Sequence, residues 1–325
     1  MFKEIRNPDL YHGKNKKKFF FEGWYYKVCD KFNDRVFAFI PGIVKGKDKK
    51  SSHSFIQVLD GKNSNYNYIK YSENYFKYNN KVFQINIDKN YFSLDKLNLD
   101  LKFNNKTIKG NLKLKNIKKW PDTFINPGSM GFYNYFWFME CYSQVCAQNG
   151  EIEGALNIDN EMIDFTGGKV YIEKNWGHSF PKSWIWIQSN SFDNKNIAFT
   201  CSVGKVPFLF GSFSGFLVGL NIDDVFYSFT TINKSKMKIK EYENDVEIIF
   251  KRKNLLLKVK TKSRKEKFIS CMGPKRGNMI PLVKENLKGE VILELKDIKK
   301  SKVIYKGIGK STGIEYGGDQ LYFRV

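Results

Sequence analysis

The chain has 325 residues, of which 42% are hydrophobic and 16% aromatic, and its formal net charge is +22. This length and apolar content exclude an intrinsically disordered chain and suffice for one large or two ordinary domains. Only six of the 55 basic residues are arginines, the residue suited to bidentate recognition of bases and phosphates, so we expect no specific nucleic-acid partner. Dispersed lysines fit contact with an anionic membrane surface better than they fit nucleic-acid binding.

The targeting signals of the sequence are few. Residues 1–18 form a polar arm without the apolar segment of a secretion signal. The longest apolar run, residues 207–222, is interrupted by three glycines and falls short of the ~20 residues that a membrane helix needs. Five cysteines, with no Cys-x-x-Cys pair and no histidine at zinc spacing, predict reduced thiols and no metal site. We therefore expect a cytoplasmic protein, peripheral to a membrane if it touches one.

The first half of the chain reads as a series of β-strands. Residues 19–28 alternate, which places Glu22 and Trp24 on one side and Tyr25 on the other. Similar short runs follow over residues 35–40, 53–59, 82–87, 97–103 and 111–117. Period two predicts half-buried antiparallel strands, and no stretch has the spacing of an amphipathic helix. His53 is a polar candidate in these strands, whereas Glu22 could simply meet a lysine at a strand end.

An aromatic segment follows a predicted loop at residues 120–131. Residues 132–142 carry a single charge, Glu140. Burying an unpaired carboxylate costs several kcal/mol, so such a group finds a partner or keeps its proton. Glu140 is therefore a candidate acid, and a carboxylate hydrogen-bonded to Tyr, Trp or Lys inside a barrel is an equally good interpretation.

The densest polar and aromatic stretch spans residues 167–192. It holds three of the six tryptophans, and two predicted strands are separated by breaks at Gly177 and Pro181. The second strand places Trp184, Trp186 and Gln188 on one face. An apolar surface with a few polar groups is typical of small-molecule pockets. The candidates in this stretch are Glu173, Asn175, Trp176, His178, Trp184, Trp186 and Gln188. From residue 197 onward the sequence again consists of short predicted strands, as in the first half.

The same stretch resembles the tocopherol cyclase family. The run Glu-Lys-Asn-Trp-Gly at residues 173–177, Phe-Pro at 180–181 and Trp-x-Trp-x-Gln-x-Asn-x-Phe at 184–192 are similar to its central signature. Blocks at residues 20–28, 127–131 and 138–142 agree in order, and a weaker glycine-rich tail follows at 307–315. The resemblance implies a mainly β fold of two consecutive lipocalin-like antiparallel β-barrel or sandwich domains. We place them at residues 1–176 and 177–325.

The resemblance also implies a reaction. Tocopherol cyclases close a prenylated hydroquinone into a chromanol ring with no redox cofactor and no metal, so the partner would be an apolar small molecule. An acid held protonated by an apolar site must protonate an alkene, and aromatic faces can stabilise the cation. The candidate acids are Glu140, Glu173 and Glu22. The candidate substrate-binding residues are Trp24, Tyr25, His53, Asn175, Trp176, His178, Trp184, Trp186 and Gln188.

Two other functions fit parts of the sequence. A lipocalin-like binder or carrier of an apolar ligand would have the same pocket, but its carboxylates would all lie in salt bridges. A nucleic-acid module would need an exposed groove with stacked aromatics flanked by lysines. The substrate itself stays open, because a fold and its pocket can be retained while the substrate changes.

Overall fold

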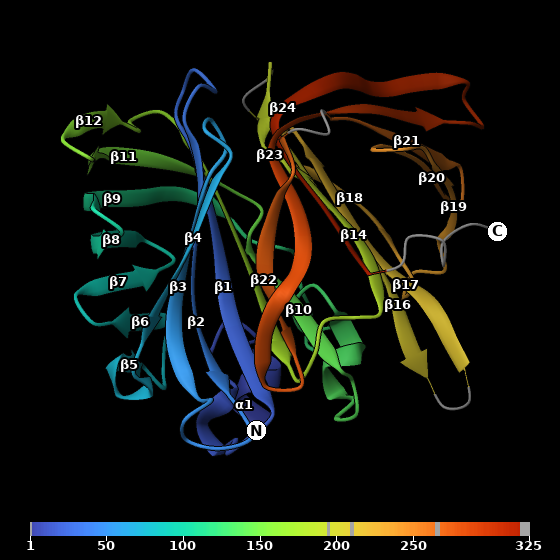
Figure 1. The fold of residues 1–325 in the computed structure, drawn as a ribbon. Helices are drawn as coiled ribbons and strands as arrows, with labels where there is room; N and C mark the ends of the chain where they lie inside the picture. Colours follow the sequence, from blue (N-terminus) through green and yellow to red (C-terminus); the bar gives the residue numbers. More distant parts are fainter. Residues whose placement is uncertain (1, 194–195, 209–210, 264–266, 319–325) are drawn as a thin grey trace. The chain divides into compact units, whose positions relative to one another are not determined.

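The computed structural model describes residues 2–193, 196–208, 211–263 and 267–318. The chain divides into two compact units, and each has its own curled antiparallel sheet (Figure 1). The first unit comprises Met1–Phe180 and Met272–Ile280, and the second comprises Pro181–Cys271 and Pro281–Val325. The expected mainly β fold of two lipocalin-like sheets is confirmed.

In the described residues, the first sheet contains thirteen strands, and four short helical segments lie in the same part of the chain. These are α1 (Phe2–Arg6), η1 (Gly13–Asn15), β1 (Phe20–Cys29), β2 (Val36–Lys45), β3 (His53–Asp60), β4 (Asn65–Tyr71), η2 (Glu73–Tyr75), β5 (Phe76–Tyr78), β6 (Gln84–Ile87), β7 (Asn90–Ser93), β8 (Lys96–Phe103), β9 (Lys106–Lys118), η3 (Gly131–Tyr135), β10 (Cys141–Ala147), β11 (Asn149–Ile158), β12 (Glu161–Asp164) and β13 (Lys169–Gly177).

The second sheet is built from the remaining eleven strands. These are β14 (Ser183–Ser189), β15 (Ser191–Phe192), β16 (Ile197–Phe208), β17 (Gly211–Ile222), β18 (Val225–Thr230), β19 (Lys236–Glu241), β20 (Val246–Arg252), β21 (Leu255–Lys262), β22 (Ile269–Lys275), β23 (Asn278–Asp297) and β24 (Lys302–Gly318). Residues 209–210, within the longest apolar run of the sequence, lie outside the described part of the chain.

The first sheet has the order β4-β3-β2-β1-β13-β11-β9-β8-β7-β6-β5, with β10 paired to β13 and β12 to β11. Its alternating apolar residues, such as Leu97, Leu99 and Leu101 on β8, point into one aromatic core. Trp24 and Tyr26 on β1 belong to the same core and are fully buried. The period-two pattern of these strands therefore places one face of each strand inside the curled sheet.

The second sheet has the order β18-β17-β16-β14-β24-β23-β21-β20-β19. Ile185 and Ile187 on β14 join its core, so the intervening Trp184 and Trp186 point to the opposite face. Gly317 on β24 lies directly opposite Trp184, and a Cβ atom there would be 2.0 Å from the indole ring. The glycine is therefore needed for the close approach of the tryptophan to its neighbouring strand.

The aromatic segment at residues 132–142 is largely not a strand. β10 begins only at Cys141, and Glu140 is half-buried in the loop before it. Aromatic content predicted burial there, whereas Phe132, Tyr135 and Trp137 are exposed. The buried positions of η3 are Gly131 and Asn134, so the aromatic residues between and after them are left toward solvent.

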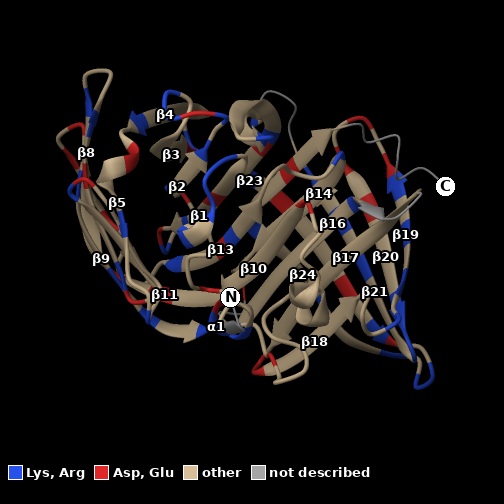
Figure 2. Cartoon of the chain, turned by 90° about the horizontal axis from the view of Figure 1, so that it is seen from below, with Lys and Arg blue, Asp and Glu red and all other residues tan. Residues whose placement is uncertain are grey.

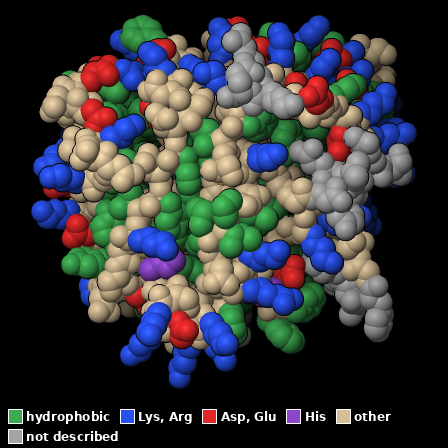
Figure 3. Space-filling view, viewed as in Figure 1, with side chains coloured by type: hydrophobic (Ala, Val, Ile, Leu, Met, Phe, Trp, Pro, Cys, Tyr) green, Lys and Arg blue, Asp and Glu red, His purple; other side chains and the backbone are tan. Residues whose placement is uncertain are grey.

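The positive charge is dispersed. Lysines and arginines occur along strands of both sheets in Figure 2, and acidic side chains are mixed with them on the face seen in Figure 3. Several pair directly, as Lys115 does with Glu153 and Lys296 with Glu294. Within the described ranges no helix is long and apolar enough to cross a lipid bilayer.

The glycine opposite Trp184 makes a testable prediction. Gly317→Ala would force the buried indole to shift, and such overpacking destabilises a core by about 1–3 kcal/mol. We expect a lower denaturant midpoint in unfolding experiments on the variant. Gly211→Ala is the matched control, because a Cβ atom there meets nothing within 4 Å. Equal midpoints for the two variants would contradict this packing.

Candidate functional site

Most candidate residues of the first unit lie on the two faces of the neighbouring strands β1 and β13. In the register of β1 and β13, Glu22 pairs with Trp176, Trp24 with Lys174 and Tyr25 with Glu173. Directly opposite residues share a face and successive residues alternate. The strands therefore place Glu22, Trp24 and Trp176 on the inner face, toward the aromatic core. Tyr25, Glu173 and Asn175 lie on the outer face.

A buried ion pair dominates the inner face. The Lys174 ammonium lies 2.7 Å from Oε1 of Glu22, and both side chains are fully buried. The backbone N–H of His12 donates to Oε2 of Glu22 at 2.9 Å. Lys174 in turn donates to the carbonyl oxygens of Pro8 (2.8 Å) and Leu10. The ion pair thus holds residues 8–12 against the inner face, with every charged atom hydrogen-bonded, as burial requires.

Two titrating groups next to Lys174 are shifted. Burial alone would raise the pKa of Glu22, but the Lys174 ammonium and the hydrogen bonds from His12 hold that pKa below its ordinary value. Burial, with the nearby Lys174 charge, lowers the pKa of His12. Nδ1 of His12 lies 2.9 Å from the Lys174 ammonium and accepts its hydrogen bond, so the neutral imidazole fits this site. Glu22 is therefore an ionised structural carboxylate in this arrangement.

The inner-face tryptophans pack against the same groups. The imidazole of His12 stacks on Trp176 with ring centroids 4.1 Å apart, and Tyr142 stacks at 5.3 Å. The Lys174 ammonium lies 4.6 Å from the ring centroid of Trp176 and 5.1 Å from that of Trp24, within cation–π range. The ring contacts of Trp176 are core packing, and the contacts of both tryptophans with Lys174 stabilise its charge.

The outer face holds a differently bonded carboxyl group. Glu173 is 5% exposed, and the Tyr171 hydroxyl lies 2.6 Å from its Oε2. The Ser143 hydroxyl lies 2.9 Å from Oε1, and the Asn175 amide donates to Oε1 more weakly, at 3.4 Å. A hydroxyl can donate or accept a hydrogen bond. These hydroxyl contacts therefore suit Glu173 in either its protonated or its ionised state.

Other outer-face residues extend this surface. Lys27 lies directly opposite Tyr171 in the register and is buried. His53, at the start of β3, shares the outer face through the paired positions Phe21, Val44 and His53. Its Nε2 lies 2.8 Å from the Tyr68 hydroxyl, and burial lowers the pKa of His53. The outer face of the first sheet therefore carries aromatic side chains, neutral polar groups and a buried lysine.

Glu140 and His178 meet at the end of β13. The backbone N–H of His178 donates to the carbonyl oxygen of Glu140 at 2.9 Å. Gly177 has a φ of +145°, and a Cβ atom there would lie 2.2 Å from that carbonyl oxygen, so only glycine allows this approach. The two candidates are close in the backbone, although no charged contact joins their side chains in the described structure.

In the second unit, the remaining candidates lie on the outer face of β14. Trp184, Trp186 and Gln188 are buried there, and the Trp184 indole N–H donates to Glu315 on β24. The register continues from Trp186 through Glu315 to Glu285, which is 1% exposed. This face therefore carries two glutamates beside its tryptophans.

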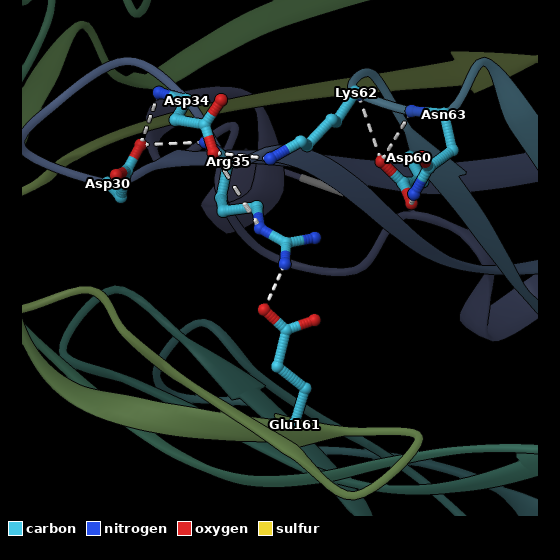
Figure 4. Close-up of polar contacts among 7 residues, drawn as sticks. All are labelled: Asp30, Asp34, Arg35, Asp60, Lys62, Asn63 and Glu161. Atoms are coloured by element: carbon cyan, nitrogen blue, oxygen red, sulfur yellow. Dashed lines mark hydrogen bonds and ion pairs between the residues drawn. The ribbon is translucent and has the colours of Figure 1, made fainter.

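A cavity opens at one end of the first sheet, away from all of these residues. It measures about 160 Å³, and Phe37, Val58 and Ile108 form its apolar floor. Arg35 crosses its rim to Glu161, and Lys62 pairs with Asp34 at 2.6 Å (Figure 4). Small-molecule pockets usually span ~300–1,000 Å³, so this cavity is too small for a prenylated hydroquinone.

Sequence reasoning missed several residues that shape these surfaces. Ser143 and Tyr171 were not selected, although Tyr171 and Glu173 are two apart in one strand and must share a face. Lys174 belongs to the same motif and lies two residues from Trp176, so the two side chains must point to the same, inner face of the sheet. Nothing in the sequence pointed to His12. In the described part of the chain, no cluster of three or more His, Cys, Asp or Glu residues could hold a metal ion.

Comparison with known proteins places the chain in a family. Residues 80–318 match the family model described as tocopherol cyclase-like. This chain belongs to the tocopherol cyclase-like family. The matched range includes Glu140, Glu173 and the outer-face tryptophans of β14, whereas Glu22 and His53 precede it.

Two plant relatives share parts of the sequence. A probable chloroplastic tocopherol cyclase of Oryza sativa subsp. japonica is 25% identical over 225 residues, covering 66% of this chain and 48% of the rice protein. The chloroplastic tocopherol cyclase of Zea mays is 32% identical over 103 residues, covering 30% of this chain and 22% of the maize protein. The chain thus spans about half the length of the rice relative and less of the maize one.

Solved structures share the fold of this tocopherol cyclase-like chain. CghA in complex with Sch210972 has a TM-score of 0.57 at 8% identity, covering 92% of this chain and 89% of CghA. Kievitone hydratase from Nectria haematococca has a TM-score of 0.51 at 11% identity, covering 96% and 93%. At these identities the likeness concerns the fold alone.

The inner-face network predicts acid sensitivity. Below the ordinary histidine pKa of 6.5 the unfolded chain takes up a proton at His12 that the folded protein resists, because the folded pKa is lower. The free energy of unfolding should fall with pH below 6.5, by at most about 1.4 kcal/mol per pH unit for one proton, until the folded pKa is passed. Glu22, whose pKa is lowered from 4.5, adds a second loss below that value.

His12→Asn tests this pH dependence. The asparagine oxygen can accept the Lys174 hydrogen bond but cannot be protonated, so the loss of stability between pH 7.5 and 5.5 should be smaller in the variant. Urea unfolding at both pH values measures the difference, and His53 is present in both proteins. An unchanged pH dependence in the variant would show that His12 is not the titrating group.

Proposed function

We propose that this chain catalyses a proton-initiated ring closure of a prenylated hydroquinone, or of a related terpenoid, to a chromanol-type ring. The observation that carries the proposal is the hydroxyl-bonded Glu173, a buried carboxyl group within the family range. We assign it the role of proton donor. The names of the rice and maize relatives support the reaction class.

The bonding of Glu173 suits a group that must lose and regain a proton. Its partners Tyr171 and Ser143 are hydroxyls, which can turn from accepting to donating as the carboxyl group changes state. Glu22 has an ammonium partner, which stabilises its ionised form. Glu22 is therefore a positioning group in this proposal.

The reaction conserves atoms. The Glu173 proton adds to an alkene carbon of the prenyl chain, and a tertiary cation forms at the neighbouring carbon. The phenol oxygen then forms a C–O bond to that carbon, and the phenol proton returns to the carboxylate, directly or through the Tyr171 hydroxyl. Tyr25, directly opposite Glu173 in the register, would present an aromatic face to the cation. The product has the mass of the substrate.

The other candidates take secondary roles. Asn175 and His178 would orient the hydroquinone hydroxyls near the end of β13, and Glu140 is the second candidate acid. The substrate-binding roles of His53, Trp184, Trp186 and Gln188 stay predictions. The packing of Trp24 and Trp176 against Lys174 favours a structural role for both.

The alternative function is that of a carrier. A carrier would have its carboxylates in salt bridges, and Glu22 meets that condition. A carrier would bind an apolar ligand and release it unchanged. Solvent deuterium separates the two functions, because ring closure places one deuterium on carbon while simple binding places none.

Glu173→Gln is the sharpest test of the mechanism. The protein is incubated in D₂O with a prenylated methylhydroquinone under anaerobic, reducing conditions, and mass spectrometry follows the cyclic product. We expect the variant to lose at least about 100-fold in rate, since general acid catalysis contributes 10²–10⁴-fold. Tyr171→Phe should lower the rate less, because Ser143 still supports the carboxyl group.

The control is Glu151→Gln, which removes an exposed carboxylate on β11 and should leave the rate unchanged. Full activity of Glu173→Gln together with inactive Glu140→Gln would transfer the acid role to Glu140. Absence of cyclic product from the unsubstituted protein, with the ligand bound intact, would support the carrier.

A further inference from the structure

The loop between β9 and β10 exposes large aromatic side chains to solvent. Trp137 is 87% exposed, Phe124 76% and Ile125 73%, and Phe132 and Tyr135 are also exposed. We call residues 121–140 the aromatic loop. The other five tryptophans are all at most 7% exposed, so Trp137 is an exception to the way this chain places its indoles.

The aromatic loop is an ordered structure. The Tyr135 hydroxyl donates to the carbonyl oxygen of Phe124 at 3.2 Å, and the Asn134 amide donates to that of Pro127 at 2.7 Å. Phe132 packs on Phe136 with ring centroids 5.9 Å apart. These bonds tie η3, the short green helix of Figure 1, to the first half of the loop. Exposure of its apolar side chains is therefore a property of the folded loop.

Such a surface needs an apolar partner. Monomeric soluble proteins rarely expose contiguous apolar patches of this kind, and those that do use them for binding. Tryptophan and tyrosine favour the boundary between water and lipid, since their rings combine an apolar body with a polar tip. A loop that exposes a tryptophan together with Phe124 and Ile125 therefore has the chemistry of a membrane-inserting loop.

The positive charge of the protein favours binding to anionic lipids. The aromatic loop has two acidic residues, Asp122 and Glu140, and no basic one. Exposed Lys118 precedes it, with Lys119 paired to Asp9, and the Arg6 guanidinium lies 3.1 Å from the centroid of the Phe124 ring. The whole chain carries a net charge of +22. Apolar insertion and attraction to anionic headgroups add in peripheral membrane binding.

We propose that the aromatic loop docks this protein on an anionic lipid bilayer, with Trp137, Phe124 and Ile125 inserted among the acyl chains near the headgroups. The proposal stands on exposure and charge and does not depend on Glu173 or on the reaction. A membrane-docked enzyme would meet a lipid-dissolved substrate where it resides.

Trp137 supplies the measurement. Its emission should be that of a solvent-exposed indole, and it should shift to the blue when vesicles of phosphatidylcholine and phosphatidylglycerol (3:1) are added to the full-length protein. Trp137→Phe should remove the shift, since the remaining tryptophans are buried. Vesicles of phosphatidylcholine alone should bind more weakly, and added salt should weaken binding to the anionic vesicles.

Co-sedimentation with the same vesicles tests the insertion. Replacing Phe124, Ile125 and Trp137 by serine should weaken partitioning on the order of tenfold or more, because three apolar side chains no longer leave water. Phe32→Ser is the matched control, since Phe32 is also 76% exposed but lies between β1 and β2. It should bind vesicles as the unsubstituted protein does. Circular dichroism confirms that each variant is folded.

Three results would overturn the proposal. One is an emission spectrum that vesicles leave unchanged, and another is equal partitioning of the triple-serine variant and the Phe32→Ser control. The third is a blue shift that grows with protein concentration in the absence of lipid, because the loop would then bind another protein surface. None of these results bears on ring closure, which is measured with dispersed substrate.

Discussion

The ion pair between Glu22 and Lys174 is the interaction on which the inner face of the first unit depends. Two charges without solvent exposure are tolerable only with complete hydrogen bonding, and the backbone of residues 8–12 supplies it. Removing one partner of such a pair typically costs about 3–5 kcal/mol. The pair therefore couples the polar N-terminal segment to the centre of the sheet, and it fixes which way β1 and β13 face.

That orientation separates two carboxyl groups that stand close together in the sheet. Glu22 points inward to an ammonium, whereas Glu173 points outward to the hydroxyls of Tyr171 and Ser143. The same residue type thus has an ammonium partner on one face and hydroxyl partners on the other. In the proposed function, Glu22 is a structural charge and Glu173 is the group that exchanges a proton.

The sequence predicted the parts of this arrangement that follow from period two. Alternation in residues 19–28 placed Glu22 and Trp24 together and Tyr25 opposite, as the register confirms. It offered a lysine as the partner of Glu22 but could not say which one, because the strand that lies beside β1 depends on long-range pairing that no local pattern encodes. The aromatic loop shows a second limit, since its composition predicted burial while side-chain bonds such as Tyr135 to Phe124 hold it exposed.

The proposed function requires Glu173 to hold a proton near neutral pH, whereas the Lys174 ammonium keeps Glu22 ionised. Infrared difference spectroscopy of the folded protein at pH 7 measures this directly, through the carbonyl stretch of a protonated carboxylic acid. We expect such a band in the unsubstituted protein, its loss in Glu173→Gln and its persistence in Glu22→Gln. A band that survives Glu173→Gln and vanishes in Glu22→Gln would contradict the assignment.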